Sequence, residues 1–318
     1  MRFFVFLVSI IHCGIVFAQA YPSKPIRFVV SFPPGGSADL MARSIAPRMA
    51  ERLGQQIVVE NRPGAGGNIG VDVVAKAAPD GYTIGLAAAG ALSLNPSLYA
   101  SMPFSPENDL APISLLAMIP FVLIANPAAP FASLKELIAF AKSQPGKLSY
   151  GHGGNGSAMH LSGELLKIMA GIELLAVPYK GSGPVAADVL GGQVPLGIVD
   201  VPSAIANVKA GKLKALAVTS TRRISAAPEV PTFVEAGLTG YESIGWFGAV
   251  APANTPPEVI NRLNSEIIAA LSNPEVRERV LAAGVEPHTS TPQEFAAFIR
   301  DEARKWGRVI KTAKVKVD

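Results

Sequence analysis

Two glycine-rich loops are the part of this sequence best suited to bind a small molecule. They are Pro33-Pro34-Gly35-Gly36 and His152-Gly153-Gly154-Asn155-Gly156, and each follows a predicted strand and precedes a predicted helix. Helix N-termini present unpaired N–H groups with partial positive charge, and glycine lets an anion approach that backbone. Glycines here can also serve only tight turns. The matched pair favours binding of one anionic ligand between the loops.

Two further features allow either a structural or a binding role. Asp39 lies in the first turn of the helix after the first loop, where a carboxylate can stabilise the helix dipole by about 0.3–1 kcal/mol. In a cleft it would repel an anion, so there it would accept a hydrogen bond from a ligand hydroxyl, amine or water. Trp246 and Phe247 can form a wall of the cleft or belong to the core.

The second loop also contains the pattern of a dinucleotide-binding fingerprint. Gly151, Gly153 and Gly156 form G-x-G-x-x-G between a strand and a helix. The fingerprint requires an acidic residue at the end of the next strand, but this strand ends in Val177-Pro178-Tyr179-Lys180. We therefore do not expect a bound dinucleotide, and we expect no other cofactor.

Other signatures of enzymes and metal sites are missing from the sequence. There is no G-x-S-x-G elbow and no Walker lysine motif. His160 and Glu164 are spaced to share a helix face, but two ligands do not make a metal site. We expect His160 to form a hydrogen bond near the cleft or to pack in the core, and we expect no bound metal.

The elements that position these loops follow a repeated strand–helix pattern. Met41, Ile45, Met49 and Leu53 predict one face of a helix that Ser37 caps and Gly54 ends. Strands are predicted at 26–32, 57–60, 83–87, 148–151, 174–177, 196–199 and 213–218. Strands that alternate with helices favour parallel sheets, so we predict an α/β protein with two lobes.

Two apolar segments, 113–126 and 241–252, are predicted to cross between the lobes and form a hinge. The helices at 257–272 and 292–311 then return to cover the first lobe. We therefore assign 21–122 and 242–318 to a discontinuous first lobe and 123–241 to the second. The expected architecture is a two-lobed solute-binding ("Venus flytrap") fold, with a mostly parallel sheet in each lobe.

Residues 1–20 have the pattern of a cleaved signal peptide. Arg2 precedes an apolar stretch that runs to Ala18, and Ala18-Gln19-Ala20 is a small-x-small cleavage site. Cleavage after Ala20 would begin the mature chain at Tyr21 and remove Cys13, the single cysteine. The mature chain would then contain no disulfide and no thiolate metal site.

Composition agrees with an exported globular protein of two lobes. The chain has 318 residues, of which 49% are hydrophobic and 16% charged. The formal net charge is +4, and no basic run is interleaved with aromatic residues. We therefore expect no nucleic-acid partner.

Motifs spread over the whole mature chain resemble the Bug-type periplasmic receptors of tripartite tricarboxylate transporters. They include both glycine-rich loops and the segments 21–27, 61–68, 79–83, 177–181, 210–213, 231–237 and 246–248. The resemblance implies a periplasmic receptor without catalysis that binds a small carboxylate. It also implies a membrane permease of one large and one small subunit as the partner. We expect the receptor to be a monomer.

The resemblance also implies ligand contacts from Phe32, Gly35, Gly36, Ser37, Asp39, His152, Gly153, Gly154, Asn155, Gly156 and Ser157, with His160 nearby. Further candidate contacts are Ala89, Gly90, Tyr179 and Asp200. His152 stands where the family usually has a small hydroxyl residue, and Asp200 lies one place after a common acidic position. The sequence leaves open the identity of the carboxylate, a sensory role with a signalling partner, and an exported hydrolase that uses the same cleft.

Overall fold

The structure is a computed structural model that describes residues 21–313. The first part of the chain contains β1 (Ile26–Val30), α1 (Ser37–Leu53), β2 (Ile57–Asn61), η1 (Ala65–Gly67), α2 (Asn68–Ala75), β3 (Thr83–Ala88), η2 (Gly90–Leu94) and α3 (Asn95–Leu98). The middle part contains β4 (Leu110–Ala125), α4 (Leu134–Ser143), β5 (Ser149–His152), α5 (Ala158–Ala170), β6 (Leu175–Pro178), α6 (Ser182–Leu190), β7 (Leu196–Asp200), α7 (Val201–Lys209) and β8 (Lys214–Val218). The last part contains β9 (Ile244–Pro252), α8 (Pro257–Ser272), α9 (Pro274–Ala282), β10 (Glu286–Pro287) and α10 (Pro292–Ala313).

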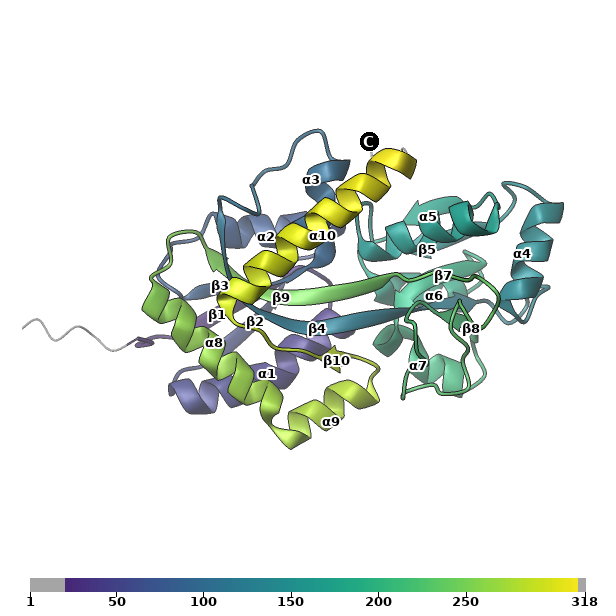
Figure 1. The fold of residues 1–318 in the computed structure, drawn as a ribbon. Coiled ribbons are helices and arrows are strands. Elements are labelled where there is room, and N and C mark those ends of the chain that lie inside the picture. The colour runs from purple at the N-terminus through teal and green to yellow at the C-terminus, as the bar shows by residue number, and fades with distance from the viewer. Residues whose placement is uncertain (1–20, 314–318) are drawn as a thin grey trace, which may run out of the picture.

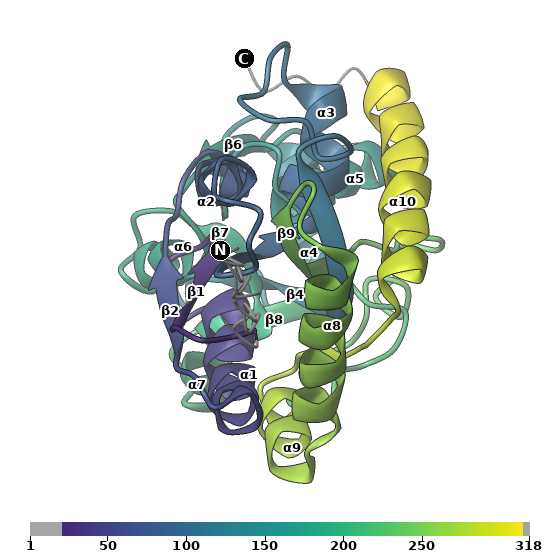
Figure 2. The same ribbon diagram turned by 90° about the vertical axis from the view of Figure 1, so that its left-hand side faces the viewer.

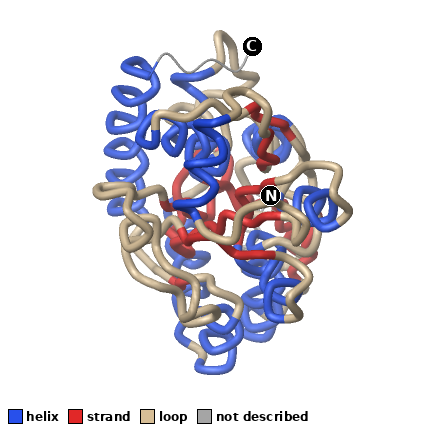
Figure 3. Tube along the Cα trace, turned by 90° about the vertical axis from the view of Figure 1, so that its right-hand side faces the viewer, coloured by secondary structure: helices blue, strands red, loops and turns tan. Residues whose placement is uncertain are grey.

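Two groups of parallel strands form the two halves of the molecule. β1 pairs in parallel with β2 and β3, and β5 pairs in parallel with β6 and β7. The strand order is β2-β1-β3-β9-β4-β7-β5-β6, with β8 and β10 also paired to β4. The helices lie on the outside of these strands, as Figure 3 shows in blue and red. The predicted α/β architecture is confirmed.

The long strand β4 joins the two halves. Its residues Leu110–Pro120 pair with β9, whereas Phe121–Ala125 pair with β7. β4 and β9 run side by side through the middle of the molecule (Figure 1). All their pairings with neighbouring strands are antiparallel, so the crossing strands make each sheet mixed rather than mostly parallel.

The apolar face and the end of helix α1 agree with the prediction from its sequence, but its N-terminal cap does not. Met41, Ile45 and Met49 are fully buried on one face, and Gly54 ends the helix in a left-handed conformation. The predicted cap is wrong: Ser37 is already helical, and Gly36 stands at the cap position without a side-chain hydrogen bond. The Ser37 hydroxyl is instead used in the contact with Asp200 described below.

The last helices return to the first half, as predicted. α8 packs against α1 and β4, and α10 packs against η2, α3 and β4. Figure 2 shows α8 and α10 along one side of the molecule. Residues Leu263 and Ile267 of α8 are fully buried in the same core cluster as Met41 of α1. This packing adds the C-terminal helices to the first half.

Two parts of the sequence analysis remain predictions. The signal peptide 1–20 lies outside the described residues, and the lobe limits at 122/123 and 241/242 are not tested by the topology. Between residues 21 and 313, no helix combines the length and the apolar character needed to cross a membrane.

Candidate functional site

A cavity lies where the two halves meet, within about 540 Å³ of space that includes open solvent at its mouth. Residues of the β1–α1 loop, the β3–η2 junction and the starts of α5 and α6 line it together. The crossing strands β4 and β9 add Ile119, Phe121, Gly245, Trp246 and Phe247, and the other lining residues are Gly66 of η1 and Asp200 of β7. The cavity therefore touches the first loop, the hinge and the start of the helix after the second loop, but none of residues 152–156.

Three helix N-termini reach this cavity. Ser37 and Ala38 begin α1, Ala158 and Met159 begin α5 after the cap Ser157, and Ser182 and Gly183 begin α6. The first N–H groups of a helix have no partner inside the helix and lie at its positive end. The site can therefore stabilise negative charge with backbone groups alone.

Asp39 holds the first loop but does not line the cavity. Its carboxylate accepts hydrogen bonds from the Gly35 N–H at 3.2 Å, from Arg43 Nε at 2.8 Å and from Asn61 Nδ2 at 3.0 Å. The Asn61 amide also donates to the Phe32 carbonyl at 2.9 Å. Of the two roles that the sequence allowed, these contacts favour the structural one.

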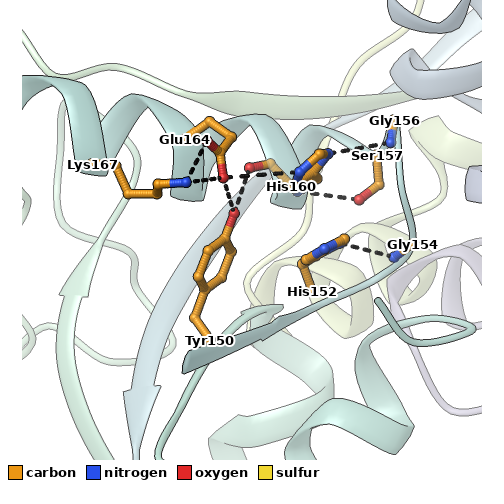
Figure 4. Close-up of polar contacts among 8 residues, drawn as sticks. All are labelled: Tyr150, His152, Gly154, Gly156, Ser157, His160, Glu164 and Lys167. Carbon is orange, nitrogen blue, oxygen red and sulfur yellow. Dashed lines mark hydrogen bonds and ion pairs between the residues drawn. The ribbon is translucent and has the colours of Figure 1, made fainter. Parts of the chain in front are cut away.

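Two buried histidines hold the second loop from behind (Figure 4). The Gly154 N–H donates to His152 Nδ1 at 3.3 Å, and the Gly156 N–H donates to His160 Nδ1 at 3.4 Å. The two rings stack with centroids 4.4 Å apart. Burial, with a contribution from the neighbouring His160, lowers the pKa of His152 to about 3. Burial also lowers the pKa of His160, so both rings are neutral and can accept these bonds.

Glu164 completes the group behind the loop without forming a metal site. Its carboxylate accepts hydrogen bonds from Tyr150 Oη at 2.9 Å and from Lys167 Nζ at 2.8 Å (Figure 4). His160 Nε2 lies 3.9 Å from Glu164 Oε1. Over residues 21–313, no group of three or more potential ligands surrounds a position for a metal ion.

The second loop also contacts the first half of the molecule. Tyr99 Oη donates to the Asn155 carbonyl at 2.9 Å. A Cβ atom on Gly66 would lie only 2.4 Å from that carbonyl oxygen, so the backbones of 64–67 and 154–157 approach closely. The second glycine-rich loop, which belongs to the second half, is therefore packed against the first half. These contacts close the cleft between the two halves.

Asp200 connects the halves directly at the cavity. Its Oδ2 atom accepts hydrogen bonds from the Ser37 N–H at 2.8 Å and from the Ser37 hydroxyl at 2.5 Å. Its other oxygen accepts from the N–H and the hydroxyl of Ser203, because Asp200 caps α7. A carboxylate of the protein thus occupies the N-terminus of α1.

Seven of the sixteen candidate residues line the cavity, and the other nine do not. Phe32, Gly36, Ser37, Ala89, Gly90, Ser157 and Asp200 line the cavity. Gly35, Asp39, His152, Gly153, Gly154, Asn155, Gly156, His160 and Tyr179 do not. Tyr179 instead donates from Oη to Asp188 Oδ2 at 2.8 Å.

Several lining residues lie outside the sixteen candidate contacts. They are Pro33, Ala38, Gly66, Ala88, Ile119, Phe121, Ala158, Met159, Ser182, Gly183, Gly245, Trp246 and Phe247. The sequence allowed Trp246 and Phe247 either a place in the cleft wall or a place in the core, and both residues are buried and line the cavity. Ser182 and Gly183 carried a weaker signal, a glycine-flanked helix start after a strand.

Comparison with known proteins identifies the family. Residues 41–315 match the model of the tripartite tricarboxylate transporter family receptor, TctC. The chain is also 41% identical to protein BugT of Bordetella pertussis over 95% of this chain and 93% of BugT. This chain belongs to the TctC family. Its relatives are solute-binding receptors of the periplasm rather than enzymes.

Solved structures of TctC relatives have the same fold as this receptor. The structure of periplasmic binding protein BugD matches with a TM-score of 0.89 and 38% identity, over 93% of this chain and 99% of that one. R. palustris Rpa4515 with adipate matches with a TM-score of 0.90 and 37% identity, over the same shares of the two chains. The predicted family and the absence of an enzymatic role in that family are therefore confirmed.

Proposed function

We propose that this receptor captures one small carboxylate in the cavity between its halves and delivers it to a membrane transporter. The observation that carries the proposal is the convergence of helix N-termini on a cavity that both halves line. A carboxylate has the charge and the size that such N–H groups stabilise. The adipate in the related Rpa4515 structure supports the same chemical class.

Membership of the family supports proposals for the place of action and for the partner. The proposed mature receptor is periplasmic and begins at Tyr21 after cleavage behind Ala20. Its proposed partner is the tripartite tricarboxylate transporter, a permease with one large and one small membrane subunit. The receptor acts as a monomer that closes on its ligand and opens at the permease.

A titration of the purified mature chain tests this function. Calorimetry against mono-, di- and tricarboxylates and amino acids should find one carboxylate bound per chain, with inorganic phosphate as the control anion. At about one hundred times the dissociation constant, a ligand stabilises the folded state by about 2.7 kcal/mol. That free energy corresponds to a melting temperature roughly 5–10 °C higher for lobes of this size.

Two outcomes would contradict the capture of a carboxylate without turnover, and a third would contradict its delivery to a transporter. The first is that no carboxylate binds to a chain that is folded by circular dichroism. The second is turnover of the bound carboxylate, followed by NMR, in proportion to receptor concentration after repurification. Turnover would favour a hydrolase. Uptake of the bound carboxylate by cells that lack the receptor, at the rate of cells that contain it, would favour a sensor.

A further inference from the structure

We propose that the ligand of this receptor is a monocarboxylic acid with an apolar body, because the side chain of Asp200 fills the position that a second ligand carboxylate would need. This inference rests on the proposed function and narrows it to one substrate class. It depends on how Asp200 is bonded, on the charges around the cavity and on the side chains that line its walls.

Asp200 uses all its hydrogen-bonding capacity within the protein. One oxygen accepts from the N–H and the hydroxyl of Ser37, and the other accepts from the N–H and the hydroxyl of Ser203. A carboxylate has about four acceptor positions, so none is left for a ligand ammonium or hydroxyl. The carboxylate is also buried, with 6% of the residue exposed. Its role is therefore to occupy the site rather than to recognise an amino acid.

Asp200 occupies the N-terminus of α1, where the sequence analysis predicted that the ligand would bind. The positive end of α1 was expected to bind an anion at Gly36 and Ser37. A Cβ atom on Gly36 would lie 3.0 Å from Asp200 Oδ2, so little space remains between this loop and the carboxylate. Among the described contacts no carboxylate bonds to the starts of α5 and α6: the Ser157 hydroxyl caps α5 at the His160 N–H, and no side chain caps α6.

The charges around the cavity disfavour a second ligand carboxylate. Asp200 is the only charged residue among the described residues that line the cavity, and no Lys, Arg or His is among them. A dicarboxylate would bring one of its charges toward Asp200, or would bury it without a cation. Both arrangements are unfavourable in a closed cavity, where charges are weakly screened.

The walls of the cavity fit an apolar body. Phe32, Ile119, Phe121, Met159, Trp246 and Phe247 line it. Such side chains bind aliphatic or aromatic carbon by removing it from water. They offer few groups for the hydroxyls of a hydroxylated acid, because the polar side chains in the lining are Ser37, Ser157, Ser182 and the already bonded Asp200.

Matched pairs of acids test the inference. Calorimetry would compare butyrate with succinate, hexanoate with adipate, and benzoate with terephthalate, so that each pair differs by one carboxylate on a similar body. For the body that binds, the monocarboxylate should bind at least about tenfold more tightly to the wild-type receptor. Asp200→Asn keeps an acceptor for the Ser37 N–H but removes the charge, and should reduce that preference about tenfold or reverse it.

Asp188→Asn is the matched control. Asp188 is on α6 in the same half and bonds to Tyr179 outside the cavity, so its replacement should leave the preference unchanged. Melting curves of both variants establish that they are folded.

Three results would overturn the inference. A dicarboxylate that binds wild type as tightly as its monocarboxylate partner contradicts it and leaves the receptor function standing. An undiminished preference in Asp200→Asn removes Asp200 as its cause. Binding of no member of the three pairs also contradicts it, and the broader titration under the proposed function then decides whether the receptor binds carboxylates at all.

Discussion

The stacked imidazoles of His152 and His160 are the residues behind the second loop whose chemistry depends most on pH. Each ring accepts a hydrogen bond at Nδ1 from a loop N–H, and a protonated ring cannot accept it. Burial lowers the pKa of His152 to about 3, whereas an unfolded histidine has a pKa near 6.5. Between these values the unfolded chain binds more protons than the folded chain, so the free energy of unfolding decreases as the pH is lowered.

This difference predicts a pH-dependent stability that His152→Asn reduces. The contribution of His152 is complete above about pH 6.5 and is lost as the pH falls toward 3, at up to about 1.4 kcal/mol per pH unit. Urea unfolding measures how much the free energy of unfolding decreases between pH 7 and pH 5. This decrease should be smaller by about 1–2 kcal/mol in the variant than in wild type. The asparagine oxygen can still accept from Gly154.

His288→Asn is the control for this experiment, because His288 is exposed and lies outside the site. If His152→Asn shows the full wild-type loss of stability between pH 7 and pH 5, His152 is not held neutral by the fold.

The two aspartates near the first helix illustrate what single residues in the sequence can predict. The position of Asp39 in the first turn of α1 was readable, and its contacts with Gly35 and Arg43 lie within four residues. The contact of Asp200 with Ser37 joins residues 163 positions apart. It depends on how the halves close, which local pattern does not encode.

At the scale of elements, the start of α6 provides a position from which the cavity can be filled without backbone strain. Gly183 lines the cavity, and an added Cβ would meet no atom nearer than the Pro34 carbonyl oxygen at 4.0 Å. Gly183→Leu should therefore fold and should place its side chain in the ligand's space. We expect it to lose most of the roughly 5–10 °C rise in melting temperature that a saturating ligand causes.

Gly191→Leu, at the exposed C-terminal end of the same helix, is the matched control and should keep the full rise. A folded Gly183→Leu receptor with an unchanged ligand-induced rise would mean that the ligand binds elsewhere.

Most elements were predictable because their cause is local. The spacing of four between Met41, Ile45 and Met49 predicted α1, and Gly54 predicted its end. The apolar segment 113–126 predicted β4, which spans Leu110–Ala125. The cap of α1 was not predictable, because the Ser37 hydroxyl could either accept a hydrogen bond from an N–H of its own helix or donate one to a distant acceptor. The approach of Gly66 to Asn155 was missed for the same reason as the Asp200 contact.

At the scale of the whole molecule, the proposed export signal predicts the mass of the mature chain. Cleavage after Ala20 removes residues 1–20 together with Cys13. Intact mass spectrometry of periplasmic material should find a chain that begins at Tyr21 and carries no lipid. A chain that retains acylated Cys13 would instead indicate a lipoprotein, and an uncleaved chain would indicate an N-terminal anchor.

The central claim is that one small carboxylate fits between the two halves and is neither covalently bound nor transformed. Native mass spectrometry of receptor purified gently from the periplasm measures this directly. We expect one non-covalent organic acid per chain, released intact on denaturation and absent from the Gly183→Leu variant. A receptor that carries no acid and acquires none from the carboxylate panel, or a variant that retains the acid in full, would contradict it.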